Sequence, residues 1–228
     1  VVRIRHLLGE LYRDSLDEFS RAVEVLLPIL ELLPDDVATL NEVADLYTRS
    51  GEWELALDIM EREANLLSSS EERAVCLHRL GVICENELAD LERAESWYQA
   101  ALEQDPRHMD SLANLRRVYG AREMWPEAIQ VIQVMESSVR SFEEKSRYLL
   151  EIGQIHSERL EDRGVAIDYF EQAMDMWSGN IDAARPLAEV YWTESNWVRA
   201  EGVLALVCDS TNVFNPAPSG SEGAVHKG

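Results

Sequence analysis

The feature that most constrains this chain is a repeat with a period of 72 residues. Six sets of equivalent positions, or columns, hold one identical residue in all three copies, and fewer than about one such column is expected from ordinary residue usage. The chain therefore divides into blocks 1–72, 73–144 and 145–216 without an insertion. The columns are Gly9, Gly81 and Gly153; Leu16, Leu88 and Leu160; Ala22, Ala94 and Ala166; Tyr47, Tyr119 and Tyr191; Trp53, Trp125 and Trp197; Ala56, Ala128 and Ala200.

Within each block, apolar residues recur every three or four positions, which is the spacing of one face of an α-helix. In the first block these stripes cover residues 8–12, 22–30, 40–47 and 56–60. No segment shows the sustained apolar/polar alternation typical of strands. We therefore predict an all-α fold of twelve helices, arranged as about six antiparallel hairpins.

Residues that start and stop helices stand where the predicted hairpins meet. Ser69 and Ser141 occupy the same block position, and each is followed three residues later by a Glu, the arrangement of a capping box. Pro34 and Pro106 follow the second helix of their hairpins, where proline stops a helix. These signals place the predicted helix ends.

The residues resemble the tetratricopeptide repeat family, whose pattern places Leu-Gly and Tyr on a first helix and paired Ala residues on a second. Spacings of 35 (Gly9 to Ala44) and 37 (Ala44 to Gly81) differ from the norm of about 34, so the odd hairpins are expected to have a slightly longer turn. The 72-residue period resembles long bacterial arrays of the family. The third hairpin matches best, with Leu77, Leu80, Gly81, Ala94, Tyr98, Ala101 and Pro106, and with Cys84 in the Tyr place.

The resemblance implies a right-handed α-solenoid over residues 1–208, in which first helices line a concave inner wall. One hairpin cannot bury its apolar face alone, so neighbours stack, and we expect one cooperative domain. Residues 209–228 are rich in Pro, Gly and Ser and are expected to form a flexible tail. No polar capping helix is evident at either end, so we expect either that the chain is part of a longer array or that a partner covers its ends.

The family geometry places ten candidate partner-binding residues on the concave wall. Their mixture of amides, cations and carboxylates suits a peptide main chain with scattered charges. Trp192 has no packing role in the repeat pattern, so it is either an anchor for a partner or a cover for the end of the array. The candidates are Asn41, Asp45, His78, Asn114, Arg117, Arg147, Gln154, Arg185, Glu189 and Trp192.

The chain is strongly acidic, with 43 Asp and Glu against 21 Lys and Arg and a net charge of −22. This charge disfavours nucleic acid and anionic membrane surfaces as partners. The acidic runs are either solvated surface or a means of attracting a basic partner. We therefore expect a protein or peptide partner, with a basic one favoured. The chain shows no leader, no apolar run that could span a bilayer and only three cysteines, so we expect a cytoplasmic location.

Motifs for catalysis and metal binding are missing from the sequence. There is no phosphate-binding loop and no nucleophile with a base at a known spacing, so we expect no enzyme activity and no cofactor. Cys76 and Cys84 lack the second tight pair of a zinc site, so we expect no metal. We also reject the chaperone-carboxylate clamp of some family members. Its five positions hold His78, Val82, Asn114, Arg147 and Glu151, of which only Asn114 and Arg147 agree in kind.

The sequence therefore predicts a non-catalytic protein–protein interaction scaffold that binds a segment along its concave groove. Two alternatives stay open. The chain is either a docking or regulatory arm of a larger enzyme, or a self-associating module whose exposed ends stack.

Overall fold

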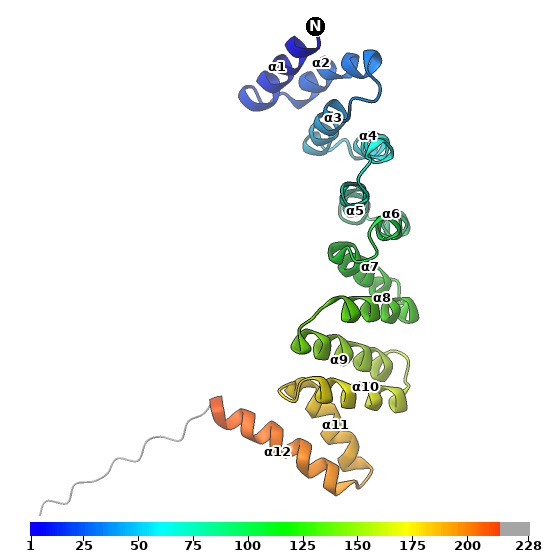
Figure 1. Ribbon diagram of the computed structural model, residues 1–228, viewed down its shortest axis with the longest axis vertical. Helices are drawn as coiled ribbons and strands as arrows, with labels where there is room; N and C mark the ends of the chain where they lie inside the picture. The colour runs from blue at the N-terminus through cyan, green and yellow to red at the C-terminus, as the bar shows by residue number, and fades with distance from the viewer. Residues whose placement is uncertain (215–228) are drawn as a thin grey trace, which may run out of the picture. The chain divides into compact units, whose positions relative to one another are not determined.

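The computed structural model describes the backbone of residues 1–214 and the side chains of residues 1–208. Over this stretch the chain forms twelve α-helices and one π-helical segment, without a strand, which confirms the all-α prediction (Figure 1). The elements are α1 (Val2–Glu10), η1 (Leu11–Ser15), α2 (Phe19–Leu32), α3 (Val37–Ser50), α4 (Trp53–Leu66), α5 (Ser70–Asn86), α6 (Leu91–Gln104), α7 (Met109–Ala121), α8 (Trp125–Ser138), α9 (Phe142–Glu158), α10 (Arg163–Met176), α11 (Ile181–Thr193) and α12 (Trp197–Phe214).

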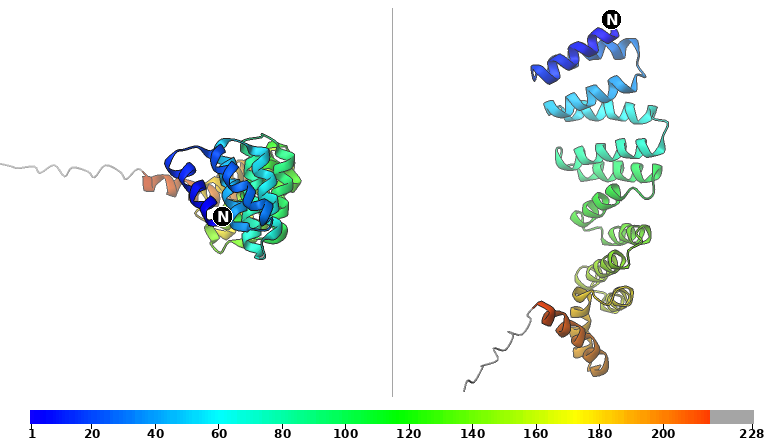
Figure 2. Two further views of the ribbon diagram at one scale, coloured as in Figure 1. Left: turned by 90° about the horizontal axis from the view of Figure 1, so that it is seen from above. Right: turned by 60° about the vertical axis from the view of Figure 1, so that its left-hand side comes forward.

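The helices pack as sequential hairpins, as predicted. In the right-hand view of Figure 2, α3 and α4 lie side by side, and so do α5 and α6. The contacts divide the chain into two compact units, unit 1 (Val1–Met135) and unit 2 (Glu136–Gly228). The single cooperative domain over 1–208 and the right-handed sense of the array stay predictions.

The glycine column sets how closely the two helices of an odd hairpin approach. A Cβ atom added to Gly81 would lie 2.4 Å from the ring of Tyr98, and one added to Gly153 would lie 2.5 Å from the ring of Phe170. Tyr98 and Phe170 are equivalent in the repeat and are only 0% and 3% exposed. Each ring therefore fills the space that a side chain would take, so the small residue is required for close packing.

Each of the six hairpins in the described residues turns on one residue with a left-handed backbone. In the odd hairpins the next backbone N–H donates to a carbonyl six residues back, as from Asp90 to Cys84. In the even hairpins it reaches five residues back, as from Glu52 to Tyr47. The odd hairpins thus have the longer turn that the spacing predicts. The left-handed residues are Asp17, Ala89 and Glu161 in the odd hairpins and Gly51, Glu123 and Ser195 in the even ones.

The helix starts predicted from capping residues are confirmed. The hydroxyl oxygen of Ser69 accepts from the backbone N–H of Glu72 at 3.3 Å, and that of Ser141 accepts from the N–H of Glu144 at 3.4 Å. Each serine satisfies one of the backbone donors that an α-helix leaves unpaired at its start.

The last described helix is longer than the sequence predicts. α12 continues to Phe214, past residue 208 where the sequence analysis ended the solenoid, and the predicted flexible tail stays a prediction. The rest of the predicted tail, residues 215–228, lies outside the described residues. Within residues 1–214, no helix is both long and apolar enough to cross a membrane.

Candidate functional site

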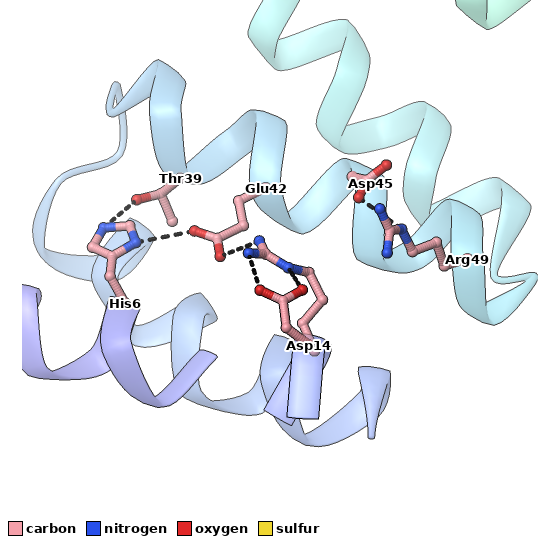
Figure 3. A network of polar contacts seen from close by, with 7 residues as sticks. His6, Asp14, Thr39, Glu42, Asp45 and Arg49 are labelled. Carbon is pink, nitrogen blue, oxygen red and sulfur yellow. Dashed lines mark hydrogen bonds and ion pairs between the residues drawn. The ribbon is translucent and has the colours of Figure 1, made fainter. Parts of the chain in front are cut away.

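Polar side chains on first helices link neighbouring hairpins in unit 1. The Nδ1 atom of His6 on α1 lies 3.0 Å from the carboxylate of Glu42 on α3, and Arg13 in η1 donates to the same carboxylate at 2.9 Å (Figure 3). The other ring nitrogen of His6 lies 3.3 Å from the hydroxyl of Thr39. The first helices of hairpins one and two are therefore joined by side-chain contacts along the face where a partner is predicted to bind.

Two of the predicted binding residues lie on α3, and both have partners within the protein. Asp45 pairs with Arg49 one turn further along α3 at 2.9 Å (Figure 3). The side-chain amide of Asn41 donates to the carboxylate of Glu63 on α4 at 2.8 Å. Asp45 is half-buried and Asn41 is exposed, so a partner can reach both side chains.

The second block holds a related network at equivalent positions. The Nδ1 atom of His78 on α5 lies 3.1 Å from the hydroxyl of Ser111 on α7, as His6 faces Thr39 in the first block. The His78 ring centroid also lies 5.2 Å from that of His108. Burial lowers the pKa of His78, and the nearby His108 adds to the effect.

Three predicted binding residues gather around Tyr98, whose aromatic ring is buried. The Tyr98 hydroxyl donates to Glu85 at 2.7 Å and accepts from the amide of Asn114 at 3.1 Å. Arg117 donates to the other carboxylate oxygen of Glu85 at 2.8 Å, and the His78 ring lies 5.5 Å from the Tyr98 ring. Burial alone would raise the pKa of Glu85, but hydrogen bonds from Arg117 and Tyr98 outweigh it and lower that pKa.

In unit 2, three predicted residues line one open cavity on α11 and α12. The cavity has a volume of about 530 Å³ and is walled mainly by apolar side chains. Trp192 is 59% exposed, and its ring meets that of Trp197 edge to face at 5.1 Å. Trp192 thus packs against Trp197 while more than half of its surface stays exposed, and its role as an anchor for a partner or as a cover for the end of the array stays a prediction. The lining residues are Arg185, Ala188, Glu189, Trp192, Thr193, Leu204 and Val207.

The other two candidates of unit 2 lie on α9. Arg147 donates to Glu143 one turn earlier in the helix, and Gln154 is exposed to solvent. The ten candidates thus divide between the units, with Asn41, Asp45, His78, Asn114 and Arg117 in unit 1. A continuous groove that uses both sets stays a prediction.

Glu63 is a residue of interest that the sequence-based prediction missed. It is only 5% exposed, although it carries a carboxylate, and it lines an open cavity of about 690 Å³ between α3, α4 and α5. The signal lies in its column of the repeat, where the other two blocks hold the apolar residues Met135 and Val207. An acidic residue at a repeat position that is apolar in the other two blocks is therefore the sequence signal that could have identified Glu63.

The described residues contain no group of three His, Cys, Asp or Glu side chains that could hold a metal ion. Cys76 is buried beside Glu63, with its sulfur 3.8 Å from the carboxylate. Burial and then the charge of Glu63 raise the pKa of the Cys76 thiol to about 12. Because the thiolate is the reactive form, Cys76 is a poor nucleophile near neutral pH.

The fold and these surfaces define a class, the helical repeat proteins built from stacked hairpins. More particularly, residues 35–107 match the family model described as tetratricopeptide repeat, so this stretch is of the tetratricopeptide type. Repeats of this kind are generally protein–protein interaction modules.

Comparisons with individual proteins agree with this fold. The chain is 24% identical over 175 residues to the Homo sapiens protein O-mannosyl-transferase TMTC3, a match that covers 77% of this chain and 19% of the relative. The chain thus matches about a fifth of that protein's length. A crystal structure of MamA protein is 22% identical, with a TM-score of 0.52, covering 77% of this chain and 91% of the other. The MamA RS-1 ArsTM double mutant is 16% identical, with a TM-score of 0.50, covering 79% and 97%.

Proposed function

We propose that this chain is a non-catalytic scaffold that binds a protein or peptide segment along the faces of its first helices. The observation that supports this most is the α11 cavity, which contains the predicted residues Arg185, Glu189 and Trp192. Trp192 leaves 59% of its surface in water, although burying a large apolar side chain is favourable. Tryptophan is enriched among the residues that dominate binding energy, so this side chain suits an anchor for an apolar group of the partner.

The net charge of the chain limits the classes of partner that it can bind. A net charge of −22 attracts basic proteins at long range and raises their association rate. The same charge opposes nucleic acid and anionic membranes, so a basic protein segment is the proposed partner. We place the scaffold in the cytoplasm, since Cys76 and Cys84 are free thiols that suit a reducing compartment.

A second candidate function is a docking arm of a larger enzyme. It is favoured by the match to about a fifth of a relative named as an O-mannosyl-transferase. Under this alternative the repeats still bind protein, and any chemistry belongs to a part of the protein outside this chain. The resemblance to long bacterial arrays stays a prediction. Self-association through exposed ends also stays a prediction, because no observation favours it.

The proposal is tested by replacing Trp192 with Ala and measuring affinity for partners captured from the source cells by the wild-type chain. We expect binding to weaken by at least about tenfold, which is typical for loss of a tryptophan hot spot. Trp177→Ala is the matched control, because Trp177 is 38% exposed in the same unit but does not line the cavity. If Trp192→Ala and Arg185→Ala both bind as the wild type does, the proposed site on α11 is wrong.

A further inference from the structure

We propose that the cavity around Glu63 in unit 1 binds the side chain of a lysine or arginine from a partner protein. The inference deepens the proposed function and rests on it, since it names a chemical group of the partner and a second place where that partner is held. It concerns unit 1 alone.

The cavity lies where the second hairpin meets the third. Glu63 from α4 lines it together with residues of α3, of α5 and of the segment between α4 and α5, and its volume is about 690 Å³. Polar and apolar groups share the lining, which suits a side chain with an aliphatic stem and a charged head. The lining residues are Val37, Asn41, Glu63, Leu67, Ser69, Glu71, Glu72, Val75, Cys76 and Arg79.

Glu63 is a buried carboxylate without a cationic partner among the described residues. One of its oxygens accepts from the Asn41 amide at 2.8 Å, and the other lies 3.8 Å from the Cys76 sulfur, whose thiol is also 3.5 Å from the Met60 carbonyl oxygen. Burying a charge away from water is costly unless an opposite charge and hydrogen bonds compensate for it. The hydrogen bond from Asn41 is in place, and the opposite charge is the part that a bound cation would supply.

The repeat itself shows that packing does not require a carboxylate here. The equivalent of Glu63 in the second block is Met135, which is 4% exposed, so an apolar side chain fills the same position in a well-packed hairpin. Its hydrogen-bond partner Asn41 corresponds to Ala113 in that block. Glu63 and Asn41 are therefore both replaced by apolar residues in the second block, as expected of two residues that form one site in the first block.

The charges around the opening favour a cation. Glu71 and Glu72 stand exposed at the start of α5, and Arg79 is the single cation among the lining residues. Three carboxylates against one guanidinium leave the cavity negative, which attracts lysine and arginine and repels acidic groups.

The test is an NMR titration of the full chain with three small probes: N-acetyl-lysine methylamide, N-acetyl-arginine methylamide and N-acetyl-norleucine methylamide. We expect at least one cationic probe to shift the side-chain amide signal of Asn41 and the backbone amide signal of Cys76, and the uncharged norleucine probe to shift neither. Glu63→Met and Glu63→Gln should each weaken cationic binding at least about tenfold, since a charge-assisted hydrogen bond is lost.

Two controls keep the result interpretable. Glu63→Met places the second block's own residue at this position, so the variant should fold with a stability equal to or above that of the wild type. Glu61→Gln removes an equal charge from the exposed face of α4 and should leave binding unchanged. The proposal is overturned if neither cationic probe binds, if norleucine binds equally well, or if both Glu63 variants bind as the wild type does. If the cavity fails this test while Trp192→Ala still weakens the binding of captured partners, the proposed scaffold function holds and only the cavity proposal is wrong.

Discussion

At Gly81 the ring of Tyr98 occupies the space where a side chain would stand, with the nearest ring atom 2.4 Å from an added Cβ. At Gly9 the nearest atom belongs to the flexible Leu26 side chain at 3.1 Å, and at Gly120 the nearest atom lies 3.9 Å away. The three helical glycines therefore differ in what they do. Gly81 permits close packing, whereas Gly120 only weakens its helix.

Replacing Gly81 with Ala should lower the free energy of unfolding by up to about 2 kcal/mol, because overpacking costs about 1–3 kcal/mol and the gain in helix propensity returns about 1 kcal/mol. Gly120→Ala should raise it by up to about 1 kcal/mol, since only the propensity gain applies. Urea unfolding of both variants checks the pair. Equal stabilities for Gly81→Ala and Gly120→Ala would show that the contact with Tyr98 does not constrain the hairpin.

The lowered pKa of His78 makes the stability of unit 1 depend on pH. The folded state disfavours protonation relative to an unfolded histidine near 6.5, so the unfolded state binds more protons as pH falls through that value. Stability should therefore be full above about pH 7 and decrease toward pH 5.5. The groups facing the ring are His108, Asp110 and Glu85.

The change His78→Gln should reduce this loss. We expect the difference in the free energy of unfolding between pH 7.5 and 5.5, measured with urea, to be smaller in the variant than in the wild type. An identical pH dependence in the two proteins would show that His78 is not the group responsible.

At the scale of elements, the backbone conformation of the turns is the same in every block, although the residue at the turning position differs. Ala89 adopts a left-handed backbone with φ of 53°, at the position where the other odd hairpins hold Asp17 and Glu161. Such a backbone costs an L-residue roughly 1–2 kcal/mol, whereas glycine adopts it freely. The closure of the hairpin imposes this conformation on whatever residue stands there.

Ala89→Gly should therefore raise the free energy of unfolding by about 0.5–1 kcal/mol, as relief of backbone strain outweighs the added entropy of the unfolded glycine. The reverse change at the left-handed residue of an even hairpin, Gly51→Ala at φ of 76°, should lower the free energy of unfolding by about 1 kcal/mol. Thermal unfolding of the two variants provides the measurement. A decrease in stability for Ala89→Gly would contradict the account of the turns.

Much of the element structure could be predicted because it depends on local pattern. Apolar spacing predicted the helices, the serines at 69 and 141 predicted two helix starts, and the alternating 35- and 37-residue spacing predicted the longer odd turns. The π-helical segment η1 and the left-handed Ala89 could not be predicted, since tertiary closure rather than residue preference imposes them.

The candidate site was predictable only in part. The family geometry placed Asn114 and Arg117 on a first helix, but not their contacts with Tyr98 and Glu85, which come from other helices. Such contacts depend on how long side chains reach across packed elements. Glu63 lies on a second helix, so a prediction confined to first helices could not include it.

At the scale of the whole molecule, the contacts form two compact units. In a stacked repeat, each hairpin depends mainly on its neighbours, so damage should spread over a limited range. Gly153→Ala, which would clash with Phe170 in unit 2, should speed amide hydrogen exchange in α9 and α10 and leave α3 and α4 within error of the wild type. Uniformly faster exchange across all helices would instead favour the single cooperative domain predicted from the sequence.

We propose that the regular frame of hairpins carries its binding residues in two places, where first helices are exposed and where one block differs in sequence from the others. The most direct test is amide hydrogen exchange of the full chain with and without a saturating captured partner. We expect slower exchange in α3 and α5 beside the Glu63 cavity and in α11 beside Trp192. Protection confined to the second helices α6 and α10, with α3, α5 and α11 unchanged, would contradict it.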